Sequence, residues 1–161
     1  MSRQVGVLLF DGFELLDVFG PVELWSRLSD RYEVTFCAVE PGPVRSSQGA
    51  VVMATEDMDA SAGHDIVLIP GGMGTRSLVD DRSFLTRLRG WATSASIISS
   101  VCTGSALLTA TGLLEGYRAT SNKMAYAWAP PTAGTSGGNH EHDGCMIVTG
   151  GHRQGLLQVW T

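Results

Sequence analysis

Short, continuously apolar segments alternate with segments of helical periodicity along the N-terminal part of this chain. Such apolar runs are typical of parallel strands that are covered on both faces, because neither face then carries polar side chains. The expected strands are residues 5–10, 32–39, 65–69 and 97–101, and the expected helices are residues 15–28 and 80–91. Strands joined through helices by short loops form right-handed β-α-β units, so the pattern predicts an α/β sandwich of three layers (α/β/α) with a mostly parallel sheet.

Two regions between these elements are less regular. Gly20-Pro21 falls inside the first helical segment, where we expect it to kink the helix or to restart it with Pro21 at the first position. Residues 44–55 are expected to form a small hairpin or an edge excursion of the sheet. Ligand chemistry is expected at the carboxyl ends of the strands, since sandwiches of this type bind their ligands there.

Length and composition indicate one soluble domain over residues 1–161. The chain is 43% hydrophobic and 17% charged, which is sufficient for a single core. The net charge of -5 and the lack of a dense Lys/Arg cluster argue against a nucleic-acid partner. We expect a cytoplasmic protein without a membrane partner, because no apolar stretch could span a bilayer and the N-terminus lacks a signal-peptide pattern. Three cysteines without C-x-x-C spacing favour thiols over a disulfide framework.

Cys102 lies where the expected strand over residues 97–101 turns into a helix. Its sulfur is therefore expected at the carboxyl edge of the sheet and at the positive end of a helix dipole, which favours thiolate over thiol. An ordinary cysteine is only slightly ionised at neutral pH, so such a position raises its reactivity directly. Cys102 is thus a candidate nucleophile, and the alternative is a buried structural cysteine.

Gly71 and Gly72 lie in the glycine-rich turn after the strand over residues 65–69. A nucleotide phosphate site is disfavoured, because no Lys-Ser/Thr pair follows this turn and no G-x-G-x-x-G follows the first strand. The turn instead predicts an oxyanion hole, in which backbone N–H groups of Gly72 and Thr103 face an atom that Cys102 attacks. The alternative is a turn that needs glycine only for its dihedral angles.

Asp17 is the strongest candidate among the acids that follow the first strand. It lies between Leu16 and Val18 on an otherwise apolar helical face, where an unpaired carboxylate is costly, so a partner or a raised pKa is expected. A protonated carboxyl beside the sulfur could hydrogen-bond the thiolate and donate a proton to substrate. The alternative is a solvent-facing acid of the first helical turn. Asp11 and Glu14 are expected to be capping or surface residues.

Several segments carry a family resemblance. They are LLFDGFELLD with GPVE over residues 8–23, IPGG over 69–72, VCTGS over 101–105, GLLEG over 112–116 and ATSNK over 119–123. In this order they resemble the PfpI-like superfamily, the class I glutamine-amidotransferase-like fold, and within it most resemble the isonitrile hydratase branch. The resemblance covers residues 4–128 and implies a flavodoxin-like sandwich that is usually a homodimer.

The resemblance also implies roles for three residues. Cys102 is implied as the elbow nucleophile, Asp17 as its carboxylate partner, and Thr103 as a support of the site beside the sulfur. For the isonitrile hydratase branch it implies addition of water to a small-molecule isonitrile, giving an N-substituted formamide, and we expect no cofactor.

One departure from the family pattern concerns the site. Family members often carry a histidine where this chain has Asn122-Lys123. A Cys-His dyad therefore has no candidate there, which disfavours proteolysis and glutamine hydrolysis. Asn122 is a further candidate for substrate contact.

A second departure concerns residues 129–161, which we expect to form an atypical or truncated tail. Residues 129–142 are loop formers, and only residues 143–151 resemble the hairpin of the family. The tail holds His140, His142, Cys145 and His152. Their spacing matches no structural zinc pattern, so no metal is expected.

The sequence therefore predicts a cysteine-dependent hydratase or lyase that acts on a small molecule. A ligand-sensing or redox-sensing module is the main alternative, disfavoured because no DNA-binding helix-turn-helix segment follows. An inactive remnant with a broken tail is a second alternative. An enzyme of the deglycase or glyoxalase type is a third.

Overall fold

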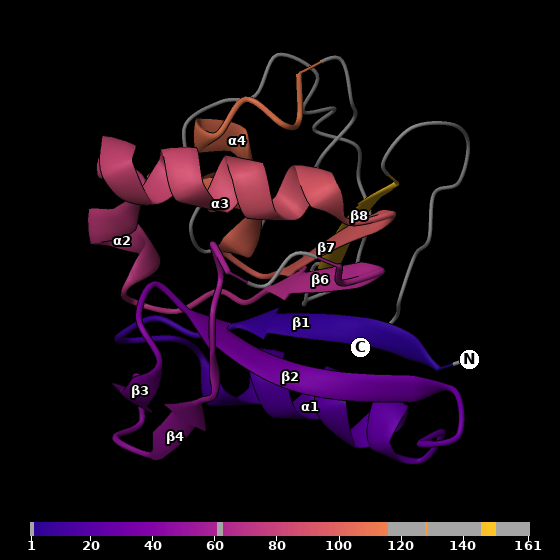
Figure 1. Ribbon diagram of the computed structural model, residues 1–161. Coiled ribbons are helices and arrows are strands. Elements are labelled where there is room, and N and C mark those ends of the chain that lie inside the picture. Colours follow the sequence, from indigo (N-terminus) through magenta and orange to yellow (C-terminus); the bar gives the residue numbers. More distant parts are fainter. Residues whose placement is uncertain (1, 61–62, 116–127, 129–145, 151–161) are drawn as a thin grey trace, which may run out of the picture.

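The computed structural model describes residues 2–60, 63–115, 128 and 146–150 (Figure 1). Its central sheet has six strands in the order β5-β2-β1-β6-β7-β8. The strands are β1 (Arg3–Leu8), β2 (Tyr32–Ala38), β5 (Glu56–Asp57), β6 (Ile66–Ile69), β7 (Ile97–Val101) and β8 (Met146–Gly150). All neighbouring strands are parallel except β7 and β8, which are antiparallel. The expectation of a mostly parallel sheet is confirmed.

Helices lie on both faces of this sheet. They are α1 (Leu15–Ser26), α2 (Thr75–Leu78), α3 (Arg82–Ser94) and α4 (Gly104–Ala110). Figure 1 shows α1 on one face and α3 with α4 on the other, so the fold has the three expected layers. The strand order explains this arrangement: the chain moves from β1 to β2 on one side and then to β6 and β7 on the other. Right-handed crossovers in opposite directions place their helices on opposite faces.

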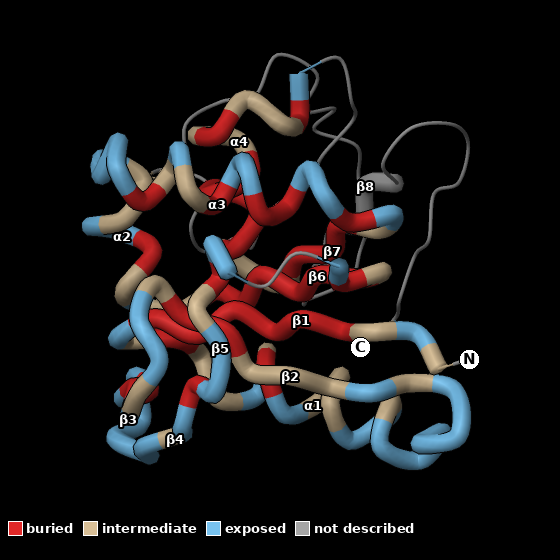
Figure 2. The backbone as a smooth tube through the Cα atoms, viewed as in Figure 1, coloured by how far each residue is buried: buried red, intermediate tan, exposed pale blue. Residues whose placement is uncertain are grey.

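The core lies where β1, β6 and β7 meet the inner side of α3 (Figure 2). All four residues of β6 are buried, and β1 is buried over its last four residues. This continuous burial explains the uninterrupted apolar runs, because both faces of these strands are covered by helices. The inward residues of α3 are Phe84, Leu88, Trp91 and Ala92.

Of the two outcomes expected at Gly20-Pro21, a kink or a restart of the helix, the restart is wrong. α1 runs continuously from Leu15 to Ser26 with Pro21 inside it. A proline inside a helix removes one backbone hydrogen bond. Packing before and after Pro21 in the chain offsets this loss: Val18 is buried, and the half-buried Val22 and Trp25 pack against the core.

The hairpin expected over residues 44–55 is present as β3 (Gly42–Arg45) and β4 (Val51–Ala54), which pair antiparallel in a separate small sheet. Figure 1 shows this hairpin and α2 beyond the ends of β1 and β2, at the edge where ligand chemistry is expected. The sequence analysis did not identify β5 or α2, because two and four residues are too short to show a period.

Some expectations concern residues that the structure does not describe. Asn122 lies outside the described residues, and so do residues 129–145 and 151–161, with the three histidines and the one cysteine named for the tail. Within residues 143–151, which resemble the family's hairpin, β8 is a strand. Among the described helices, none has the length and apolar character needed to cross a membrane. The cytoplasmic location stays a prediction.

Candidate active site

Cys102 is positioned by an abrupt turn between β7 and α4. Its φ is +54°, and no other non-glycine residue in the described part of the chain has a positive φ. This left-handed conformation costs an L-residue about 1–2 kcal/mol. A strained strand-to-helix turn of this kind lifts a nucleophilic side chain out of the sheet. The side chain of Cys102 is half-buried, and Thr103 occupies the N-cap position of α4.

Asp17 lies in the first turn of α1, and its carboxylate contacts the glycine turn after β6. The Gly71 N–H donates a hydrogen bond of 2.9 Å to Asp17 Oδ2. The pKa of Asp17 is raised from 3.8 to about 6: burial raises it most, this hydrogen bond lowers it, and the negative charge of Glu14 raises it. The sequence analysis expected a partner or a raised pKa for this carboxyl, and the structure has both.

Gly71 is packed so tightly that no side chain fits there. A Cβ at this position would lie 2.7 Å from Thr103 N, 2.8 Å from Thr103 Oγ1 and 2.8 Å from Asp17 Oδ2. Three chain segments therefore meet at Gly71: the start of α1, the turn after β6 and the residue that follows Cys102. The structure thus brings together Asp17, Gly71 and Thr103, which the sequence analysis had placed at the same edge.

The hydrogen bonds of Gly72 differ from the expected oxyanion hole. The Gly72 N–H donates to Thr103 Oγ1 at 3.0 Å, so in this structure it does not face a substrate position. A backbone N–H shielded from water needs an acceptor, and the Thr103 hydroxyl supplies it. Gly72 also has a φ of +130°, a conformation that side-chain-bearing residues rarely adopt. The positive φ agrees with a turn that needs glycine for its dihedral angles, and the oxyanion hole stays a prediction.

Thr75 belongs to this network, although the sequence analysis did not identify it. Its side chain is fully buried and donates a hydrogen bond of 2.7 Å to the Gly72 carbonyl. Its Oγ1 lies 3.1 Å from Thr103 Oγ1. Thr75 therefore holds both the turn and the Thr103 hydroxyl. The only signal in the sequence is its place three residues after Gly72, which is too general to identify a function.

Asp11 and Glu14 have the structural roles that were expected. Glu14 occupies the N-cap position of α1, and its Oε1 accepts a hydrogen bond of 2.7 Å from Gln48 Nε2. Asp11 Oδ1 accepts a hydrogen bond of 3.1 Å from the Arg45 N–H. Both acids therefore connect the loop after β1 to the β3–β4 hairpin and its turn.

A mostly parallel α/β sandwich with a cysteine in a left-handed turn between a strand and a helix defines the structural class of this protein. Within this class, residues 3–152 match the DJ-1/PfpI family, and the chain belongs to that family. The resemblance to PfpI-like proteins is thereby confirmed.

Individual relatives differ in function. The chain is 35% identical over 158 residues to isonitrile hydratase from Pseudomonas putida, across 97% of this chain and 68% of that protein. It is 31% identical over 120 residues to the HTH-type transcriptional regulator GbdR from Pseudomonas aeruginosa, across 71% of this chain and 32% of the regulator.

Among solved structures, a ThiJ/PfpI family protein from Pseudomonas syringae is similar with a TM-score of 0.69 and 30% sequence identity. The similarity covers 75% of this chain and 50% of that one, so this chain spans about half the length of that solved relative.

Proposed function

We propose that this protein uses Cys102 to add water to a small molecule, in the manner of an isonitrile hydratase. The observation that carries the proposal is the position of Asp17, which the Gly71 N–H holds beside the residue that follows Cys102. Because the pKa of Asp17 is raised to about 6, its carboxyl can both give and take a proton near neutral pH. The similarity to isonitrile hydratase from Pseudomonas putida supports the substrate class.

In the proposed reaction, the Asp17 carboxyl donates its proton to the terminal carbon of R–N≡C, and the Cys102 thiolate adds to the same carbon. This gives a thioimidate, R–N=CH–S–Cys102, and leaves Asp17 as a carboxylate. Water then adds to that carbon, and its oxygen becomes the formyl oxygen. One proton of the water passes to nitrogen and the other to Asp17, while the C–S bond breaks and restores the thiolate. The sum is R–N≡C + H₂O → R–NH–CHO.

Thr103 is proposed to stabilise negative charge that develops during the attack of water. Its backbone N–H donates no hydrogen bond within the described part of the chain. A backbone N–H next to the nucleophile is a typical oxyanion donor. Gly71 and Gly72 are proposed to shape the substrate site. The Gly72 N–H would join as a donor only after exchanging its bond to Thr103 Oγ1. Asn122 stays a candidate substrate contact.

A ligand-sensing module is the second candidate function. The similarity to a transcriptional regulator from Pseudomonas aeruginosa favours it, because that match covers 71% of this chain. A sensor would bind its ligand at the Cys102 site without turnover.

The test of the proposed function is incubation with an alkyl isonitrile and measurement of the N-alkyl formamide by NMR. We expect turnover by the unaltered protein and loss of turnover in Cys102→Ala and Asp17→Asn. Asp30→Asn is the matched control, because it replaces an exposed carboxylate with the same amide and should keep full turnover. Equal turnover by Cys102→Ala would overturn the proposal, and saturable isonitrile binding without formamide would favour the sensor.

We also propose that the protein is a homodimer. Four large apolar side chains are exposed in α1 and just after it: Leu16, Phe19, Leu24 and Leu28. Contiguous exposed apolar surface marks protein interfaces, and we propose that these side chains contribute to one. Since α1 also carries Asp17, a partner on this helix would contribute to the walls of the site. Light scattering after size exclusion should give the mass of two chains, and Leu24→Glu should give one. A monomeric unaltered protein would contradict the proposal.

A further inference from the structure

A second group of reactive side chains lies outside the Cys102 site. Cys37 in β2 and Glu56 in β5 are register partners in neighbouring parallel strands, so their side chains leave the same face of the sheet. His64, which lies before β6, places its Nε2 4.0 Å from Cys37 Sγ and 3.9 Å from Glu56 Oε2. All three potential ligand atoms lie within 4.8 Å of one another. A thiol, an imidazole and a carboxyl thus converge on one point.

Gly6 in β1 makes room for the imidazole of this cluster. A Cβ at Gly6 would lie 2.8 Å from His64 Cγ and 2.7 Å from Trp91 Cζ2. The rings of His64 and Trp91 meet edge to face over β1, with centroids 5.9 Å apart. Glycine inside a strand weakens that strand. This buried strand therefore carries a destabilising residue at the one position where an imidazole packs against it.

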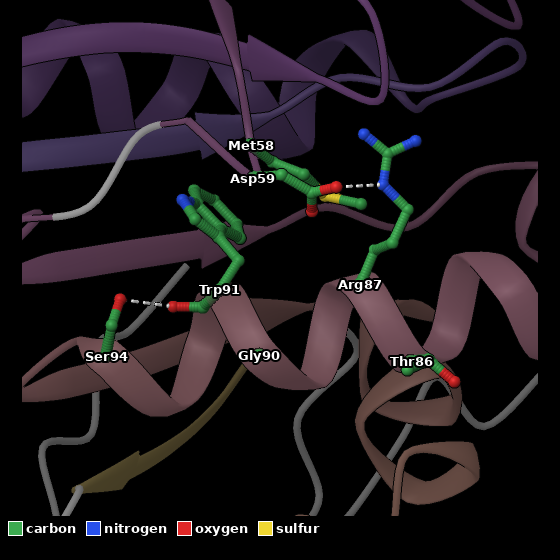
Figure 3. Close-up of a pocket in the computed structure, with 7 residues that line it drawn as sticks. All are labelled: Met58, Asp59, Thr86, Arg87, Gly90, Trp91 and Ser94. Atoms are coloured by element: carbon green, nitrogen blue, oxygen red, sulfur yellow. Dashed lines mark hydrogen bonds and ion pairs between the residues drawn. The ribbon is translucent and has the colours of Figure 1, made fainter.

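The surroundings hold the cluster in place. Trp91 lines a pocket of about 330 Å³, and Figure 3 shows its ring, on α3, facing Met58 and Asp59. In the same view Arg87 of α3 contacts Asp59, and its Nε donates a hydrogen bond of 2.6 Å to Asp59 Oδ2. Arg87 also donates to Asp57 Oδ1 at 3.2 Å. These bonds fasten the segment around β5, the short edge strand, to α3.

Burial is graded across the cluster. Cys37 and His64 are buried, whereas the Glu56 side chain is 45% exposed. The two inner side chains are therefore shielded from water. A cation could enter from solvent along the carboxylate, which provides the entry path that a metal site needs.

The chemistry of the three side chains fits zinc. Thiolate, imidazole and carboxylate are the ligand types that Zn²⁺ takes in proteins, and a thiolate with a carboxylate neutralises its two positive charges. In a tetrahedral site, sulfur and nitrogen ligands lie about 3.6 Å apart, and nitrogen and oxygen ligands about 3.4 Å apart. The two separations from His64 Nε2, 4.0 Å to Cys37 Sγ and 3.9 Å to Glu56 Oε2, need to close by about 0.5 Å, and the third pair, Cys37 and Glu56, lies within 4.8 Å.

We propose that Cys37, Glu56 and His64 bind Zn²⁺, with water as the fourth ligand on the exposed side of Glu56. The proposed hydratase reaction does not use this site, and the role proposed for the metal is to stabilise the fold. The metal joins the edge strand β5 to β2 and to the segment before β6, and its binding free energy adds to the stability of the fold.

The test is titration of the reduced, chelator-treated full chain with Co²⁺, since a Co–thiolate bond gives a charge-transfer absorption band. We expect one Co²⁺ per chain, displaced by Zn²⁺. Cys37→Ser should remove the band, whereas Cys102→Ala and Cys145→Ala should keep it. A band that survives in Cys37→Ser, or no band in the unaltered chain, would overturn the proposal.

A second variant covers the case in which Cys37→Ser does not fold. Glu56→Gln changes a partly exposed side chain and should weaken Zn²⁺ binding at least about tenfold, because even outer-shell partners of a metal are worth 10–100-fold in affinity. Glu33→Gln, an exposed carboxylate on β2, is the matched control and should bind as the unaltered chain does. Zn²⁺ should raise the thermal midpoint of Glu33→Gln more than that of Glu56→Gln. Equal affinities in these two variants would overturn the proposal.

Discussion

Gly71 donates its backbone N–H to Asp17 Oδ2 at 2.9 Å, although the two residues are 54 positions apart in the chain. The bond joins the first turn of α1 to the turn after β6. It stabilises the ionised carboxyl, yet burial has the larger effect, and the pKa of Asp17 rises to about 6. About a tenth of this carboxyl is therefore protonated at pH 7, which is the property that the proposed proton transfer needs.

Replacing Asp17 by asparagine should stabilise the protein above pH 6. Folding raises the pKa of Asp17 from 3.8 to about 6. The stability that its carboxyl contributes is therefore complete below about pH 4 and is lost as pH rises through about 6. Asparagine has no charge to bury, and its oxygen can still accept from Gly71. We expect Asp17→Asn to gain about 1–2 kcal/mol in free energy of unfolding above pH 6, a range reduced for partial exposure, and to gain little below pH 4.

Urea unfolding at the two pH values measures this difference, with Asp30→Asn as the exposed control that should change little at either pH. A gain of the same size at both pH values would contradict the raised pKa of Asp17.

The pH dependence of turnover should report Asp17 directly. The value of kcat/KM should fall as pH rises through about 6, because the proton-donating form of Asp17 is lost. Glu14→Gln removes a negative charge that raises the pKa of Asp17, so the falling limb should move to lower pH. Profiles of kcat/KM against pH for both proteins check this, and Asp30→Asn should follow the unaltered protein. A limb that stays in place or moves to higher pH in Glu14→Gln would argue against Asp17 as the acid.

A methyl group at Gly71 should disrupt the site. In Gly71→Ala, the Cβ would overlap Thr103 N and Asp17 Oδ2, so one of these groups must move. We expect a loss of about 1–3 kcal/mol in free energy of unfolding and a fall in kcat/KM of up to about 100-fold, the effect of displacing a reacting group by about 1 Å. Gly90→Ala in α3 is the matched control, because its Cβ would meet nothing within 4 Å.

Gly90→Ala should instead gain about 0.5–1 kcal/mol, since alanine favours a helix interior over glycine. Urea unfolding and steady-state kinetics of the two variants test the contrast. Similar losses in both variants would show that Gly71 is not specially constrained.

The left-handed backbone conformation at Cys102 leads us to predict which substitution there is more stable. Because φ is +54° there, glycine should fit better than any other residue. Cys102→Gly should be about 1 kcal/mol more stable than Cys102→Ala, and both variants should lack turnover. The same comparison at position 90 in α3 should have the opposite sign. If Cys102→Ala proves as stable as Cys102→Gly in urea unfolding, the strained elbow is contradicted.

Much of the fold was predictable because the periodicity of apolar residues is a local property. The runs around β1, β6 and β7 identified buried parallel strands, and the spacing of residues in α3 identified its inward face. The restart expected at Pro21 was wrong for the same reason, since the local cost of the proline is visible in the chain while the packing of Val18, Val22 and Trp25 that offsets it is not.

For the candidate site, local pattern was enough to place Cys102, Gly71 and Asp17 at one edge, because each follows a strand that ends there. Packing between distant segments set the rest: the bond from Gly72 to Thr103, the buried Thr75, and the approach of Cys37 to His64 across 27 positions. Hydrogen-bond partners and burial depend on distances between segments far apart in the chain, and no periodicity within one segment encodes those distances.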